Sequence, residues 1–118
     1  MHLKEIIQLK NEIEKILDDN KATEITSIDL ENKTSIADFM IIASGHSSKH
    51  IQSLAEILLT KLKENGISNC HLEGKDSSEW KLIDAFDIIV HIFHPEKRKF
   101  YELEKMWSEL IPKERLIL

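Results

Sequence analysis

Apolar residues recur at intervals of three and four in two stretches of the chain, a pattern typical of amphipathic helices. The first stretch lies within residues 1–21 and ends in a small polar run, whose side chains compete for backbone hydrogen bonds. The second follows Ser47 and Ser48, either of which can cap a helix, and stops at Asn65-Gly66. The two stripes comprise Leu3, Ile6, Ile7, Ile13, Ile16 and Leu17, and then Ile51, Leu54, Ala55, Leu58, Leu59 and Leu62.

Other apolar runs indicate strands. Residues 39–43 are consecutively apolar and lead to Gly45, which favours a strand buried on both faces inside an α/β sheet. Residues 25–30 and about 70–72 predict further strands, and 80–84 and 87–93 predict an antiparallel hairpin joined by Ala85-Phe86. We therefore expect one α/β domain over residues 1–118, with a single mixed sheet of about five strands and packed helices.

The segment after this hairpin predicts one more helix. Pro95 suits a first helical turn, and an apolar stripe of Phe100, Leu103, Met106, Trp107 and Leu110 follows before Pro112. We expect an N-terminal helix over residues 1–21 and a C-terminal tail over residues 109–118, which ends in the apolar residues Leu116, Ile117 and Leu118.

Composition narrows the function classes. The chain has 118 residues, a single cysteine and a net charge of −5. One cysteine excludes an internal disulfide, and the acidic balance disfavours a domain that relies on phosphate contacts. No apolar run reaches the roughly 20 residues of a membrane-spanning helix, and the chain begins without the features of a signal peptide. We expect a cytoplasmic protein with a basic protein partner.

Several polar residues could carry chemistry, but each also has a structural interpretation. Gly45 followed by residues 46–48 resembles an anion site at a helix N-terminus, or a tight turn with a serine cap. His46 and His50 have metal-ligand spacing without a third ligand nearby. Asp84 and Asp87 form either a carboxylate pair or the flanks of a turn, and the turn is favoured. We expect no metal site and no cofactor.

Aromatic residues concentrate near the C-terminus. Six of the seven lie at Trp80, Phe86, Phe93, Phe100, Tyr101 and Trp107. Tryptophan, tyrosine and arginine are enriched in interface hot spots, yet aromatic residues equally fill cores. The pattern leaves a binding face and a packed core as equal alternatives, with Trp80 and Tyr101 as the better candidates for exposure.

Several segments together resemble the ribosomal silencing factor family, also called RsfS or Iojap-like. The similarity covers about residues 22–108. It is carried by Thr34 through His50, by Glu73-Gly74 with Glu79-Trp80, by Asp84, Asp87 and Val90-His91-Ile92-Phe93, and by Arg98 through Trp107.

This resemblance implies a fold similar to nucleotidyltransferases without the catalytic carboxylates, and therefore no enzyme. It implies binding to ribosomal protein L-fourteen on the large subunit, which blocks subunit joining and represses translation under nutrient limitation. Nucleic acid would enter only through the ribosomal context. The implied contact residues are Trp80, Asp84, Asp87, His91, Phe93, Arg98, Tyr101 and Leu103. The alternative is a nucleotidyltransferase-like enzyme that uses the loop after Gly45 with Asp84 and Asp87.

Two departures from the family pattern bear on this surface. The family usually has glycine before the second aspartate of the turn, where this chain has Phe86, and phenylalanine adopts positive φ only at a cost. Lys81 replaces a residue that is usually apolar. Many family members are dimers, and apolar residues near the chain ends (Ile6, Ile13, Leu116, Ile117 and Leu118) are candidates for such an interface.

Overall fold

The structure is a computed structural model that describes residues 3–30, 37–67, 69–77 and 79–96. Its elements are α1 (Leu3–Asp19), β1 (Thr23–Asp29), β2 (Phe39–Ser44), α2 (Ser48–Glu64), β3 (His71–Glu73), β4 (Trp80–Ala85) and β5 (Ile88–Phe93). The α/β class and the single sheet of about five strands are confirmed. The helix expected after Pro95 lies outside the described residues.

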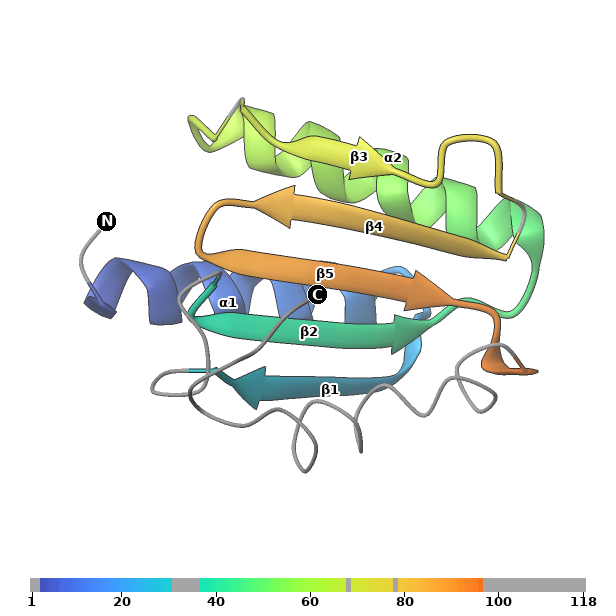
Figure 1. Cartoon of the computed structure of the whole chain (residues 1–118), viewed down its shortest axis with the longest axis horizontal. Helices are drawn as coiled ribbons and strands as arrows, with labels where there is room; N and C mark the ends of the chain where they lie inside the picture. The colour runs from blue at the N-terminus through green and yellow to red at the C-terminus, as the bar shows by residue number, and fades with distance from the viewer. Residues whose placement is uncertain (1–2, 31–36, 68, 78, 97–118) are drawn as a thin grey trace.

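The sheet is mixed, with strand order β1-β2-β5-β4-β3 (Figure 1). β2 and β5 pair in parallel at its centre, while the other neighbouring strands pair antiparallel. Every residue of β2 and β5 is buried. Their mainly apolar character, interrupted only by Ser44 and His91, follows from this position, because a central strand covered on both faces has no side that favours polar residues.

Both described helices lie on one face of the sheet (Figure 1). The apolar core between these layers takes side chains from both helices and from alternate positions of β2, β4 and β5. In α1 the buried stripe is Ile6, Leu9, Ile13 and Leu17. The prediction placed Ile7 on this stripe and left Leu9 out, and both assignments are wrong, since Ile7 is 39% exposed and Leu9 is buried. The observed intervals of three and four keep one helical face toward the core.

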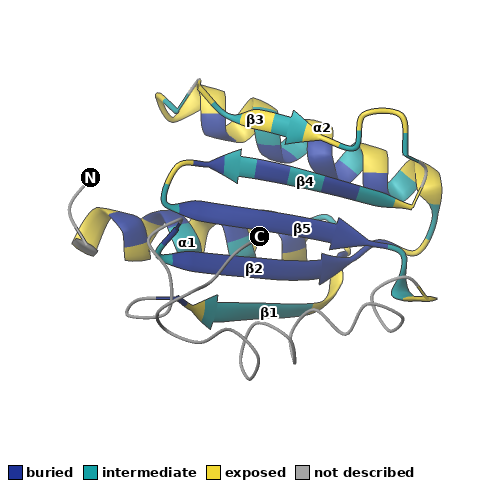
Figure 2. Ribbon diagram, in the orientation of Figure 1, coloured by how far each residue is buried: buried dark blue, intermediate teal, exposed yellow. Residues whose placement is uncertain are grey.

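The opposite face of the sheet carries a second apolar cluster. Met40 and Ile42 of β2 and Ile89 and Phe93 of β5 are buried there. β4 contributes side chains that are only partly buried, so exposure on this face increases from the centre toward β4 (Figure 2). Strand alternation explains the division, because successive residues point to opposite faces.

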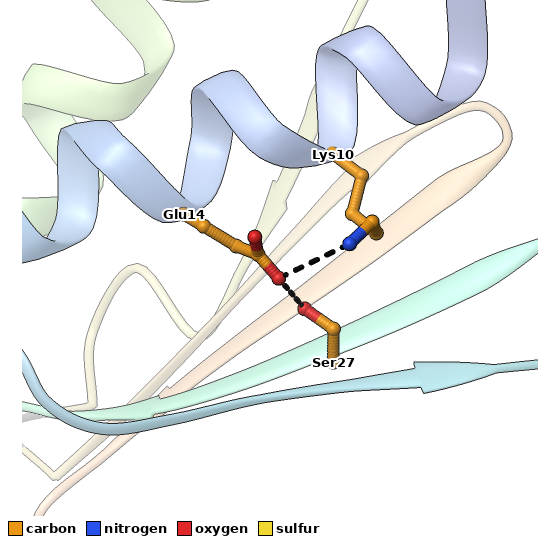
Figure 3. Close-up of polar contacts among 3 residues, drawn as sticks. All are labelled: Lys10, Glu14 and Ser27. Atoms are coloured by element: carbon orange, nitrogen blue, oxygen red, sulfur yellow. Dashed lines mark hydrogen bonds and ion pairs between the residues drawn. The ribbon is translucent and has the colours of Figure 1, made fainter. Parts of the chain in front are cut away.

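Polar contacts attach α1 to the edge of the sheet (Figure 3). Lys10 Nζ lies 3.4 Å from Glu14 Oε2, and the Ser27 hydroxyl of β1 donates to the same oxygen. The Lys10 ammonium also lies 5.6 Å from the centroid of the Phe39 ring on β2. These partly buried contacts connect α1 to β1 and β2 beside the apolar core.

The ends of α2 follow the predicted chemistry. The Ser47 hydroxyl accepts a hydrogen bond from the His50 backbone N–H at 3.0 Å, which confirms the serine cap. Gly45 allows close approach of the helix, because a Cβ there would lie 2.7 Å from Ile51 Cγ1. The helix ends at Glu64 with Asn65 as its C-cap, and Gly66 then adopts φ +86°.

The residues proposed for a dimer interface in α1 are not available for one. Ile6 and Ile13 are 4% and 0% exposed within the chain itself, where they pack in the core under the helices. That assignment is wrong, because the amphipathic stripe is used to attach the helix to its own sheet. Residues 116–118 lie outside the described part of the chain, and the homodimer stays a prediction.

Candidate functional site: an aromatic cluster on the β4–β5 hairpin

The hairpin of β4 and β5 brings together three of the predicted contact residues. In the antiparallel register Trp80 faces Phe93, and Leu82 faces His91. Residues paired in this way point to the same side of a sheet. All four side chains therefore lie on the face opposite the two helices. The two-residue turn at Phe86 and Asp87 sets this register, because Ala85 pairs with Ile88 across it.

Trp80, His91 and Phe93 form a compact aromatic group, here called the Trp80 cluster. The Trp80 ring centroid lies 6.5 Å from that of His91 and 6.3 Å from that of Phe93. His91 and Phe93 stack at 5.5 Å with an interplanar angle of 13°. Trp80 is half-buried, whereas His91 is 9% and Phe93 3% exposed. The indole thus rests on two rings that are themselves buried.

A hydrogen bond orients the indole. Trp80 Nε1 donates to His91 Nδ1 at 3.4 Å, which requires that Nδ1 carry no proton. Burial lowers the pKa of His91 to about 4, because the charged imidazolium would lose its hydration. At neutral pH the ring is therefore an uncharged acceptor for the Trp80 N–H.

The loop before β4 fixes the other side of Trp80. Gly74 has φ +80°, and a Cβ there would lie 2.7 Å from both Trp80 Cε3 and the Trp80 carbonyl oxygen. The Ser77 hydroxyl accepts hydrogen bonds from the backbone N–H groups of Trp80 and Glu79, both at 3.2 Å. Only glycine allows the loop to approach the indole this closely.

Lys81 holds the same loop from the helix-facing side of the sheet. It is 5% exposed, and its ammonium donates to the carbonyl oxygens of Gly74, Lys75 and Ser77 at 2.6, 3.0 and 2.5 Å. The resemblance to the family indicated only that Lys81 stands where an apolar residue is usual. In the sequence, the alternation of Lys81 with Ile83 along the strand could have indicated that Lys81 is buried. Its three carbonyl partners could not be found in this way, because they become its neighbours only when the loop folds back.

Asp84 and Asp87 lie at the other end of the hairpin. Asp84 Oδ1 accepts a hydrogen bond from the Phe86 N–H at 3.1 Å, which confirms the turn interpretation for Asp84. Ala85 pairs with Ile88, so the turn residues are Phe86 and Asp87. The predicted Ala85-Phe86 connection is wrong by one position, because Ala85 is buried and extends the strand. The Asp87 carbonyl accepts from the N–H groups of Asp38 and Phe39.

The described contact residues thus lie at the two ends of the β4–β5 hairpin. Trp80, His91 and Phe93 form one group, and Asp84 lies four residues along β4, or about 13 Å away at roughly 3.3 Å per residue. Both groups border the same sheet face. Arg98, Tyr101 and Leu103 lie outside the described residues.

The alternative candidates have partners within the protein. The His46 and His50 rings lie 4.0 Å apart, but His50 Nδ1 accepts from the His46 N–H and Nε2 bonds the Asn20 carbonyl. Both nitrogens of His50 are therefore engaged. Cys70 contacts the Ile67 carbonyl, and burial raises the pKa of its thiol. Within the described ranges no three histidine, cysteine or acidic side chains converge as metal ligands.

These features define a small α/β protein with a half-exposed, rigidly held tryptophan on a mixed sheet. Among the described helices, none has the length and apolar character needed to cross a membrane. A sequence profile described as "Ribosomal silencing factor during starvation" matches residues 3–116. The chain belongs to the ribosomal silencing factor family.

Individual relatives agree with this assignment. The chain is 47% identical to ribosomal silencing factor RsfS of Zymomonas mobilis over 92 residues, which cover 78% of this chain and 69% of that protein. It is 38% identical to RsfS of Bacillus subtilis over 92 residues, which cover 78% of each chain. A crystal structure of a protein from Chromobacterium violaceum aligns with a TM-score of 0.81 at 36% identity, covering 92% of this chain and 88% of that one.

Proposed function

We propose that this chain binds the large ribosomal subunit through ribosomal protein L-fourteen, blocks joining of the small subunit and thereby represses translation in the cytoplasm under nutrient limitation. Membership of the silencing factor family supports a ribosome-associated role. The resemblance of the motifs supplies the partner and the steric mechanism. The chain would contact ribosomal RNA only as part of the large subunit to which it is bound.

The preorganised state of Trp80 is the observation that best supports a protein contact. Its indole is half-buried and is held by His91 and Phe93 on one side and by Gly74 on the other. A side chain already fixed in place loses little conformational entropy on binding, so more of its contact energy contributes to affinity. Tryptophan in such a setting is the residue most often found as an interface hot spot.

The remaining proposed contact residues divide by exposure. Asp84 and Asp87 are half-buried and would pair with basic side chains of the partner. His91 and Phe93 are nearly buried, so their contribution is mainly to support Trp80. The resemblance adds Arg98, Tyr101 and Leu103 to the same surface.

Cosedimentation with purified large ribosomal subunits tests the proposal. The parent should bind and should reduce the formation of joined ribosomes in a sucrose gradient when small subunits are added. Trp80→Ala should weaken binding by about 2 kcal/mol or more, a hot-spot magnitude. Ile57→Ala provides a matched control, because Ile57 is likewise partly buried but lies on α2.

Circular dichroism and urea unfolding must show that both variants remain folded, since Trp80 also packs against the second apolar cluster. The proposal fails if the folded parent does not sediment with large subunits at low micromolar concentration. The assignment of Trp80 fails if its folded alanine variant binds as tightly as the parent.

A further inference from the structure

Phe86 combines two unfavourable features at the tip of the β4–β5 hairpin. Its backbone has φ +64°, a region that is an outlier for bulky side chains because Cβ approaches the following carbonyl. Phe86 is also 52% exposed, the highest value for a large apolar residue in the described part of the chain. The ring therefore gains little from burial to offset the strained backbone.

Glycine would remove both features. Glycine adopts positive φ without steric cost, and it has no apolar ring to expose. The turn is otherwise well formed, since Asp84 Oδ1 accepts from the Phe86 N–H and Ala85 pairs with Ile88. A bulky residue is rarely held in this region, and strained backbone conformations cluster at functional sites.

The surroundings of the Phe86 ring indicate what it would contact. Asp84 and Asp87 flank it in sequence, and the backbone N–H of Asp38 bonds the Asp87 carbonyl, so three acidic residues gather at this end of the sheet. All three are half-buried. On α1, Lys10 is already engaged with Glu14 and with the ring of Phe39, the residue that pairs with Ile88 at this end of the sheet.

An exposed aromatic residue on a turn flanked by aspartates suits a guanidinium or ammonium group. The ring face attracts the cation, and a neighbouring carboxylate can accept its hydrogen bonds. The chain as a whole carries a net charge of −5, which favours the approach of a basic surface.

We propose that Phe86 is an additional contact residue of this chain, and that its ring receives an arginine or lysine side chain from the basic protein surface bound along the β4–β5 hairpin. This inference rests on the proposed ribosomal function and extends it.

Three variants and purified large ribosomal subunits test the inference. Phe86→Gly should raise the urea midpoint of unfolding, because the strain is relieved, and should weaken binding by about tenfold, because the ring is lost. Phe86→Leu keeps apolar bulk without a π face and should weaken binding by about threefold. Lys21→Gly is the matched control, since Lys21 also has positive φ, at 72°, and lies at the α1–β1 connection. It should leave affinity within about twofold.

The outcomes separate this inference from the proposed function. If the parent does not bind large subunits, the proposed function itself fails. If the parent binds and Phe86→Gly binds equally well, the Phe86 contact is refuted. If Phe86→Leu retains full affinity, the cationic partner is refuted. A change in oligomeric state of Phe86→Gly in analytical ultracentrifugation would assign the ring to a contact between copies and overturn the inference.

Discussion

Gly74 and Gly66 form a natural pair for testing how the loop before β4 supports Trp80. Both have positive φ, at +80° and +86°. A Cβ added at Gly66 would meet nothing within 4 Å, whereas one at Gly74 would lie 2.7 Å from the Trp80 carbonyl oxygen and from its ring. The effects of Gly74→Ala and Gly66→Ala on stability should therefore differ mainly because only the Cβ at position 74 collides with Trp80.

The magnitudes follow from these contacts. Gly66→Ala should cost about 1–2 kcal/mol, the penalty for placing an L-residue in the left-handed region. Gly74→Ala should cost this amount and a further 1–3 kcal/mol or so for overpacking against Trp80. The backbone oxygen cannot rotate away, so the strain must displace either the loop or the strand. We expect Gly74→Ala to weaken binding to large subunits and Gly66→Ala to leave it unchanged.

Urea unfolding followed by far-ultraviolet circular dichroism measures the free energy of unfolding of each variant. The two values can be compared if the dependence of this free energy on urea concentration has the same slope, because the slope reports the surface exposed on unfolding. Equal destabilisation within about 0.5 kcal/mol would refute the collision with Trp80. Equal affinity of the folded Gly74→Ala variant and the parent would show that the loop does not hold Trp80 in its binding position.

Two further predictions concern stability. The pKa of His91 is about 4 in the folded state and 6.5 ordinarily. The neutral, buried imidazole therefore contributes about 3 kcal/mol to the free energy of unfolding above pH 6.5, and this contribution is lost as the pH falls through 4. His91→Gln should flatten the dependence of unfolding free energy on pH between 4 and 6.5, and profiles parallel to the parent's would contradict this. Glu14→Gln and Ser27→Ala should show a coupling of about 1 kcal/mol in a double-mutant cycle, since Glu14 accepts from the Ser27 hydroxyl. Strict additivity would exclude that contact as a stabilising one.

The family resemblance named three residues that the structure places next to one another, and their role as contact residues stays a prediction. Trp80, His91 and Phe93 were predicted as contact residues, and the structure brings them together. The contact between Trp80 and His91, eleven positions apart, depends on the hairpin register that a two-residue turn imposes. The role of Lys81 was not predictable, because its three carbonyl partners belong to a loop whose path no periodicity specifies.

The sequence by itself determined the features that depend on interactions over a few residues. Its periodicity determined the helices and the central strands, Ser47 determined the start of α2, and Asn65-Gly66 determined its end. Only the tertiary structure decided features that depend on distant residues. The core under α1 selected Leu9 over Ile7, and strand pairing moved Ala85 into β4 and left Phe86 strained and exposed. Local hydrogen bonding explains the first group, whereas strand order and packing between layers decide the second.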